Sequence, residues 1–193
     1  MAVFGSARPK QEHWAYEELK QLCRSLSEMG CDIITGGGPG LMQAANEGAR
    51  EARSTNGTQS IGIRVALPFE QNANPFVEQT FEHETFFTRL HQFVLMSDAY
   101  VVAPGGIGTV LEAMMIWQLL QVRHLNDVPL VFAGPMWRGL VDWAKAQMLR
   151  PGFELAAAAD MQIPLCVDTR AEVLAAIREH HARWITATGK DDR

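Results

Sequence analysis

The segment PGGIGTVLE, residues 104–112, places glycines, a hydroxyl and a carboxylate at the start of an expected helix. Glycines let backbone amides approach an anion closely, and the amides and dipole of a helix N-terminus favour negative charge. Thr109 and Glu112 also have the T-x-x-E spacing of a capping box, in which the two side chains satisfy backbone amides. The residues alone leave two interpretations open: a phosphate cradle beside a catalytic carboxylate, or only a capped helix.

A second glycine segment, GGGPG at residues 36–40, also precedes an expected helix. Glycine-rich turns between strands and helices are common without any ligand, so one such loop decides little. Two of them on neighbouring strands favour an anion site. The candidate phosphate-binding residues in these loops and in the loop after the first strand are Gly37, Gly38, Gly40, Gly105, Gly106, Gly108 and Ser6.

The kind of phosphate is narrowed by what the two loops lack. Neither contains the GK[ST] sequence of a P-loop, and neither completes GxGxxG, because Leu41, Met42 and Leu111 stand where the third glycine would be. No acidic residue ends the following strand to bind a ribose 2′-hydroxyl. ATP hydrolysis and NAD chemistry are therefore disfavoured, and a mononucleotide or sugar phosphate is favoured.

Four charged residues are candidates for binding or chemistry. Glu112 could act as a base or stabilise a cationic transition state. Arg89, at the edge of the apolar face of an expected helix, is either a solvated flank or a bidentate phosphate clamp. Arg8 is a second candidate clamp. Glu70, in LPFEQNANP, either reaches the mouth of the pocket or has a surface role.

Other chemistries find no support in the sequence. The six histidines show no metal-ligand spacing, there is no GxSxG elbow, and no cysteine stands in a glycine loop. The three cysteines are scattered, which is typical of reduced thiols rather than of a metal cluster or disulfide framework. We expect neither a metal nor another cofactor.

Strands alternate with helices along the chain, which predicts an α/β fold: a doubly wound, mostly parallel, Rossmann-like sheet of about six or seven strands, with helices on both faces. The expected strands cover residues 2–4, 32–35, 60–67, 98–103, 128–133 and 165–167. The expected helices cover residues 15–29, 41–53, 86–96, 109–122, 137–149 and 170–184. Residues 68–84 form a long polar loop, and residues 185–193 a frayed tail.

In such a sheet, ligands bind beyond the carboxyl ends of the strands, where the strand order reverses. With the common order 3-2-1-4-5-6, the loops after the first and fourth strands flank this point, and the loop after the second is adjacent. The sequence therefore predicts that Gly5–Arg8, Gly36–Gly40 and Pro104–Thr109 converge on one crevice.

Length and composition set broader limits. A chain of 193 residues is consistent with a single domain, residues 1–193. Its net charge of -5 argues against a nucleic-acid surface. The chain has no run of about 18 apolar residues, so no membrane span is predicted. The N-terminal sequence does not resemble a signal peptide. We expect a cytoplasmic protein with a small-molecule nucleotide substrate, no nucleic acid partner and no membrane partner.

Three segments together resemble the LOG (Lonely Guy) family, long labelled as lysine decarboxylases. They are TGGGPGLMQAANEGA at 35–49, FFTRL at 86–90 and PGGIGTVLE at 104–112. The last matches the pattern PGGxGTxxE at every fixed position. VFGSAR at 3–8 and LPFEQNANP at 67–75 are also similar to family segments, so the resemblance extends from the N-terminus to about residue 133.

The resemblance implies a Rossmann-like homodimer with phosphoribohydrolase activity. Such enzymes cleave the N-glycosidic bond of nucleoside 5′-monophosphates, such as AMP or cytokinin ribotides, and release the base and ribose 5-phosphate. It further implies that Arg89 and Glu112 are the catalytic pair, that Gly105 to Thr109 hold the phosphate and ribose, and that Glu70 contacts the substrate. A carboxylate suits this chemistry, because loss of the base builds positive charge on the ribose.

Two positions depart from the family pattern. Leu90 replaces a usual lysine, and Gln118 stands where many members have threonine. Both bear on substrate identity and on whether activity is retained.

The alternative function is a non-catalytic protein that binds a nucleotide or carries a phosphorylated cofactor such as molybdenum cofactor. Met114, Met115 and Trp117 are expected to form core or, in a dimer, an apolar contact face.

Overall fold

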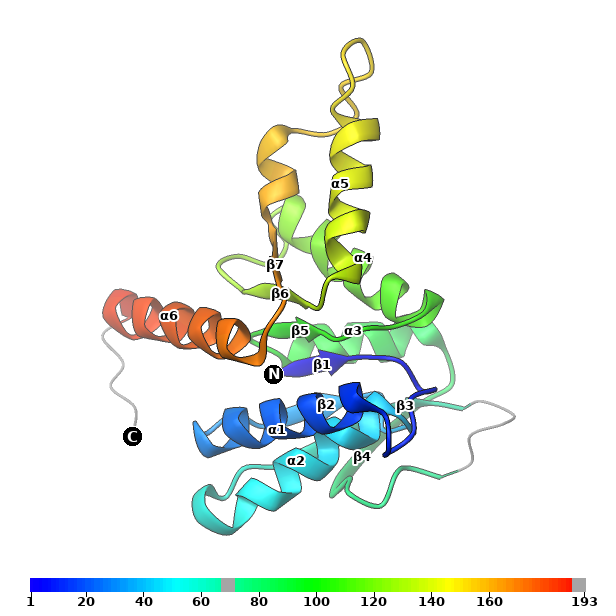
Figure 1. The fold of residues 1–193 in the computed structure, drawn as a ribbon, viewed down its shortest axis with the longest axis vertical. Coiled ribbons are helices and arrows are strands. Elements are labelled where there is room, and N and C mark those ends of the chain that lie inside the picture. Colours follow the sequence, from blue (N-terminus) through cyan, green and yellow to red (C-terminus); the bar gives the residue numbers. More distant parts are fainter. Residues whose placement is uncertain (67–71, 189–193) are drawn as a thin grey trace.

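The structure is a computed structural model that describes residues 1–66 and 72–188. Glu70, a candidate from the sequence, lies outside the described residues. Within them, seven parallel strands form one sheet in the order β4-β3-β2-β1-β5-β6-β7 (Figure 1). The strands are β1 (Ala2–Phe4), β2 (Ile33–Thr35), β3 (Ser60–Val65), β4 (Gln79–His83), β5 (Tyr100–Val102), β6 (Leu130–Ala133) and β7 (Pro164–Val167).

Helices connect the strands, as the alternating pattern predicts. They are α1 (Trp14–Glu28), α2 (Leu41–Asn56), α3 (Phe86–Met96), α4 (Ile107–Gln121), α5 (Met136–Met148), the short 3₁₀ helix η1 (Ala158–Gln162) and α6 (Arg170–Thr188). The α/β Rossmann-like fold is thus confirmed. In the described part of the chain, none of these helices combines the length and the apolar character that crossing a bilayer would require.

The expected strand order 3-2-1-4-5-6 is confirmed for the six predicted strands, but the sheet has one strand more. The prediction of a loop over residues 68–84 is wrong for Gln79–His83, which pair with β3 as the edge strand β4. This strand was not recognised because an edge strand buries little: four of its five residues are polar, and three are exposed. The predicted frayed tail is also wrong for residues 185–188, because α6 continues to Thr188.

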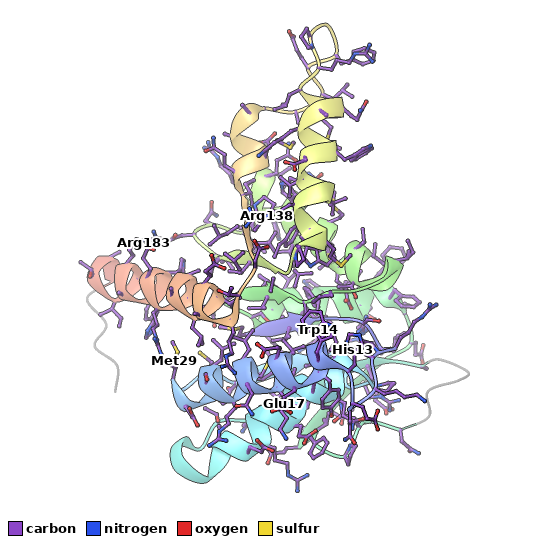
Figure 2. All side chains as sticks on the ribbon, viewed as in Figure 1. His13, Trp14, Glu17, Met29, Arg138 and Arg183 are labelled. Atoms are coloured by element: carbon purple, nitrogen blue, oxygen red, sulfur yellow. The ribbon has the colours of Figure 1, made fainter. Side chains whose placement is uncertain are left out.

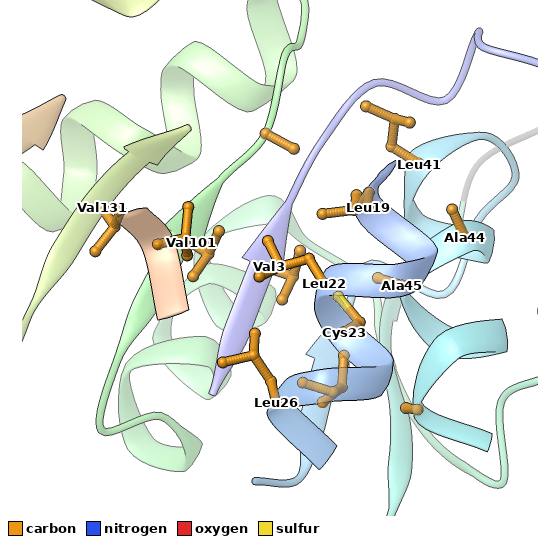
Figure 3. Close-up of a cluster of buried hydrophobic side chains, with 14 of the residues drawn as sticks. Val3, Leu19, Leu22, Cys23, Leu26, Leu41, Ala44, Ala45, Val101 and Val131 are labelled. Atoms are coloured by element: carbon orange, nitrogen blue, oxygen red, sulfur yellow. The ribbon is translucent and has the colours of Figure 1, made fainter. Parts of the chain in front are cut away.

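Successive residues of the central strand point to opposite faces of the sheet, and each face has its own core. Val3 packs with residues of α1, α2 and α6, and Figure 3 shows Leu22 and Leu26 of α1 beside it. Phe4 packs on the other face with residues of α3, α4 and α5. The sheet is therefore covered on both sides, as parallel sheets require.

Trp117 belongs to the core on the α3, α4 and α5 side. It is buried, and its indole N–H donates a 2.8 Å hydrogen bond to the carbonyl of Asp160. Met114 and Met115 are half-buried against the same cluster. Of the two roles expected for this face, core packing is the one that Trp117 fills.

The packing of α1 on α2 fixes where the first glycine loop ends. His13 begins α1 by accepting a hydrogen bond from the amide of Ala15, and its ring lies beside Trp14 (Figure 2). Glu47 of α2 binds Tyr16 at 2.6 Å and Lys20 at 2.8 Å on α1. Gly48 allows the two helices to approach closely, because a Cβ there would overlap the carbonyl oxygen of Lys20.

We predict that Gly48→Ala lowers the free energy of unfolding by about 1–3 kcal/mol, the usual cost of overpacking. The added methyl group would displace the backbone of α1 at Lys20 and Arg24. Gly139→Ala on α5 is the matched control, because a Cβ there has no heavy atom within 4 Å. Urea denaturation should show that the control gains about 0.5–1 kcal/mol from helix propensity. Equal effects of both substitutions would contradict the close contact of α1 and α2.

Candidate functional site

The three loops predicted to converge do lie together at the carboxyl edge of the sheet. The amide of Ser6, after β1, donates to the carbonyl of Pro104, after β5, at 3.1 Å. The carbonyl of Ser6 accepts a 2.8 Å hydrogen bond from Leu41, the first residue of α2. Ser6 therefore links the two glycine loops at the point where the strand order reverses.

The second glycine loop opens directly into α4, and the helix start differs from the prediction. The helix begins at Ile107 rather than Thr109, with Gly106 as the N-cap and no side-chain cap. The capping box of Thr109 and Glu112, one of the two interpretations that the sequence leaves open, is therefore wrong. Its physical reason is that the Glu112 carboxylate is bound elsewhere, by Arg89.

Because no side chain caps α4, its first amides remain available. In the described part of the chain, the amides of Ile107, Gly108 and Thr109 have no hydrogen-bond partner. Gly106 to Gly108 are exposed. The side chain of Thr109 is buried and lies against Gly105, where a Cβ would overlap it. This arrangement is a ready anion site at a helix N-terminus.

Arg89 reaches the site from α3. Thr85 caps the start of this helix, because its hydroxyl accepts a 3.2 Å hydrogen bond from the amide of Thr88. The Arg89 guanidinium is satisfied on several sides. Its Nε donates to the carbonyl of Ile63 on β3 at 2.9 Å, and its Nη1 donates to Glu112 Oε1 at 2.8 Å. It also lies 5.1 Å from the ring centre of Phe93. One side chain thus connects β3, α3 and α4.

The partners of this ion pair are both buried, with 9% of Arg89 and 8% of Glu112 exposed. Burial raises the pKa of the Glu112 carboxyl above its ordinary value, and the charge and hydrogen bond of Arg89 oppose that rise. A carboxyl with a raised pKa, in contact with a fixed cation beside an anion site, is typical of groups that act in acid, base or electrostatic catalysis.

Gly36 belongs to the site, although the sequence did not single it out. The Nη2 atom of Arg89 occupies the space that a Cβ at position 36 would need. Gly36 directly follows β2, and β2 lies beside β3, whose Ile63 carbonyl binds Arg89. A glycine at that position in the sequence is the signal that could have identified it. Glycine is required here for close approach of a side chain.

The first glycine loop is less open to a ligand than the second. The amide of Gly37, at φ 70°, donates to Thr35 Oγ1 at 2.9 Å. The carbonyl of Gly38 accepts a 2.9 Å hydrogen bond from the Asn74 side chain. Gly40, at φ 68°, lies against the backbone of Ser6 and Ala7, where no side chain would fit.

The remaining candidates lie further from the pair. The side chain of Arg8 is exposed, and within the described residues it makes no hydrogen bond or ion pair with Arg89 or Glu112. Leu90 is buried on α3. Gln118 is exposed on α4 and binds Gln121. The structure thus brings Ser6, both glycine loops, Arg89 and Glu112 together, whereas the Arg8 side chain is exposed and is not bonded to Glu112 in the described residues.

Comparison with known proteins places this geometry in context. A family model described as "Possible lysine decarboxylase" matches residues 42–177. The pyrimidine/purine nucleotide 5′-monophosphate nucleosidase of Escherichia coli K12 is 28% identical over 110 residues. That match covers 54% of this chain and 24% of the nucleosidase, so the chain spans about a quarter of its relative's length.

Solved structures share the fold over nearly the whole chain. The molybdenum cofactor binding protein of Rippkaea orientalis has a TM-score of 0.67 and 18% identity, covering 92% of this chain and 94% of that one. The Moco carrier protein of Chlamydomonas reinhardtii has a TM-score of 0.65 and 21% identity, covering 94% and 96%. At such identities the likeness establishes the fold.

We predict that Gly36→Ala displaces the Arg89 guanidinium, because its methyl group would take the space of Nη2. The free energy of unfolding should fall by about 1–3 kcal/mol, and a crystal structure of the variant should show a lengthened Arg89–Glu112 contact. Gly108→Ala is the control, since a Cβ there meets no heavy atom within 4 Å. An undisturbed ion pair in Gly36→Ala would refute the assignment of Gly36 to the site.

The raised pKa of Glu112 predicts a specific pH dependence of stability. The folded protein binds the Glu112 proton more tightly than the unfolded chain does. Protonated Glu112 therefore contributes stability at low pH, and this contribution is lost as pH rises through the pKa of the folded state. Glu112→Gln does not titrate. Urea unfolding between about pH 4 and pH 9 should therefore show the variant gaining stability relative to wild type as pH rises. Parallel pH profiles would exclude a raised pKa.

Proposed function

The chain belongs to the family described as possible lysine decarboxylase, the LOG family that its motifs predicted, and we propose that it hydrolyses a nucleoside 5′-monophosphate. The bond cleaved is the N-glycosidic bond, and the products are the free base and ribose 5-phosphate. AMP or a cytokinin ribotide is the proposed substrate. The similarity to a nucleotide 5′-monophosphate nucleosidase supports the same class of reaction.

The observation that carries this proposal is the buried Arg89–Glu112 pair beside unpaired helix amides. Glu112 follows Gly108 by four residues, which is about 6 Å along the helix axis on the same face. This separation is comparable with the length of a ribose 5-phosphate unit. A phosphate at the start of α4 would therefore bring the anomeric carbon of its ribose near the Glu112 carboxylate.

The reaction follows from these positions. The bond between the anomeric carbon and the base nitrogen breaks, its electron pair leaves with the base, and positive charge builds on the ribose. The Glu112 carboxylate stabilises that charge and orients a water molecule toward the anomeric carbon. The water oxygen adds to the carbon and the base nitrogen gains a proton, so one water is consumed. Binding energy from the remote phosphate positions the bond.

Arg89 contributes through Glu112. Its guanidinium is held by the Ile63 carbonyl, so the carboxylate that it binds has a fixed direction. It also opposes the effect of burial on the Glu112 pKa and thereby favours the ionised form that this chemistry needs. The fixed direction depends on the planar fork of arginine, which presents one nitrogen to each partner.

Lysine decarboxylation, which the family description suggests, has less support from the residues. A pyridoxal phosphate enzyme requires a lysine that reaches the cofactor. Lys20 on α1 forms ion pairs with Glu47 and Glu51 on α2. Lys10 is exposed before α1, and Lys145 is exposed on α5. Among the described residues, no lysine stands in either glycine loop.

A second candidate function is a non-catalytic carrier of a phosphorylated ligand. The observation that favours it is that two solved structures of this fold are named for molybdenum cofactor binding or carriage. The free amides at the start of α4 would serve such a ligand equally well. The buried ion pair argues for hydrolysis, because holding a phosphate does not require a buried carboxylate beside it.

We predict that incubation with AMP yields adenine and ribose 5-phosphate, measured by chromatography over a panel of nucleoside mono-, di- and triphosphates. Glu112→Gln and Arg89→Ala should each reduce kcat/KM by about 100-fold or more, the usual effect of removing an electrostatic stabiliser. The matched controls are Arg24→Ala and Glu28→Gln. That pair lies on α1, and each of its side chains is 47% exposed.

The controls should retain full turnover, because exposed i,i+4 pairs contribute little. Normal turnover in both site variants would refute the assignment of Arg89 and Glu112. Thermal stabilisation of the wild type by a nucleotide, without any product, would instead favour the carrier function.

A further inference from the structure

A buried polar network joins the first glycine loop to the segment that returns to β4. Asn74 and Asn46 are its centre, with 8% and 0% of their surfaces exposed. Asn74 Nδ2 donates to the carbonyl of Gly38 at 2.9 Å and to Asn46 Oδ1 at 3.0 Å. The Asn74 backbone amide donates to the carbonyl of Gly37 at 2.8 Å. One residue therefore binds two successive carbonyls of the loop.

Each amide orientation in this network is fixed by its partners. Asn46 Oδ1 accepts from the Thr35 hydroxyl at 2.7 Å as well as from Asn74, and Asn46 Nδ2 donates to Ser60 Oγ at 2.9 Å. Asn74 Oδ1 accepts the amide of Phe76 at 3.1 Å. Turning either amide over would place donors against donors. A fully satisfied buried network of this kind has a single low-energy arrangement.

This arrangement sets the direction of the Gly38 amide. In a trans peptide the carbonyl and the N–H of one unit point in opposite directions. The carbonyl of Gly37 points to Asn74, so the N–H of Gly38 points away from it. The Asn74 segment lies beside β3, because the Glu78 amide binds the Ser60 carbonyl at 2.8 Å. The opposite side of the loop is the β1 side, where Gly40 contacts Ser6 and Ala7.

We propose that Asn74 is a positioning residue for the substrate phosphate. By holding the carbonyls of Gly37 and Gly38, it aims the Gly38 amide at the crevice between β1 and β5. In the described residues this amide has no hydrogen-bond partner. It supplements the amides at the start of α4, so the phosphate is bound from two loops. The proposal rests on a phosphorylated ligand at this site, as in the proposed function.

Asparagine is the side chain that this position requires. Aspartate has the same shape and keeps the acceptor for Phe76, but it lacks the two donor hydrogens and places a negative charge against the Gly38 carbonyl. Alanine removes the side-chain contacts and leaves the backbone contact to Gly37. Both changes remove the side-chain bond that holds the Gly38 carbonyl, and so loosen the loop at Gly38, without touching Arg89 or Glu112, whose hydrogen bonds involve neither Asn74 nor Asn46.

The test measures binding of ribose 5-phosphate by calorimetry, together with kcat and KM for AMP. Asn74→Ala should raise the dissociation constant of ribose 5-phosphate and the KM for AMP about tenfold or more, as expected for a lost bond to a charged group. The kcat should change less than about threefold. Asn72→Ala, an exposed asparagine in the same segment, is the matched control and should bind as wild type does.

Thermal melts establish that each variant is folded at the assay temperature, and Asn74→Asp serves if the alanine variant is not. A loss of stability with unchanged ribose 5-phosphate binding would make Asn74 merely structural and overturn the proposal. Absence of ribose 5-phosphate binding in the wild type would also overturn it. If the wild type binds this ligand but does not cleave AMP, weaker binding by Asn74→Ala still supports the positioning role, while the hydrolase assignment falls.

Discussion

A guanidinium ion cannot be buried without partners, and the satisfaction of Arg89 governs how this edge of the sheet is built. Leaving either partner of a buried ion pair alone costs several kcal/mol, typically about 3–5. The carbonyl of Ile63 and the carboxylate of Glu112 meet that requirement from β3 and α4, while α3 supplies the arginine. These elements must therefore keep their relative positions. The site is held by the same contacts that hold the fold together there.

The two glycine loops meet the requirements of an anion site in different ways. The loop at 36–40 uses most of its polar groups internally, apart from the Gly38 amide: Gly37 donates to Thr35, and Asn74 binds the carbonyls of Gly37 and Gly38. The loop at 104–108 leaves the first amides of α4 without partners in the described chain. Rigidity on one side of the crevice and unpaired donors on the other together give a preorganised cradle, which needs little rearrangement to bind a phosphate.

Most of the fold could be predicted because buried strands and amphipathic helices have strong local patterns. β4 could not, since Gln79–His83 carries little apolar signal at the sheet edge. The convergence of the loops followed from topology alone. The use of Glu112 did not, because T-x-x-E spacing describes a capping box equally well, and the choice depends on Arg89, a residue distant in sequence. Gly36 and Asn74 were missed for the same reason: their roles are defined by contacts across the fold.

The contact between Gly36 and Arg89 also constrains how such a sequence can change over generations. A side chain at position 36 and an arginine at position 89 compete for one volume. The effect of each substitution therefore depends on the other residue, and their free energies will not add. A lineage that first loses the arginine can then fill position 36 at little further loss. Either order leaves the Glu112 carboxylate without its cation, but only the order that fills position 36 first also passes through a displaced guanidinium, so this epistasis makes the two evolutionary routes unequal in cost.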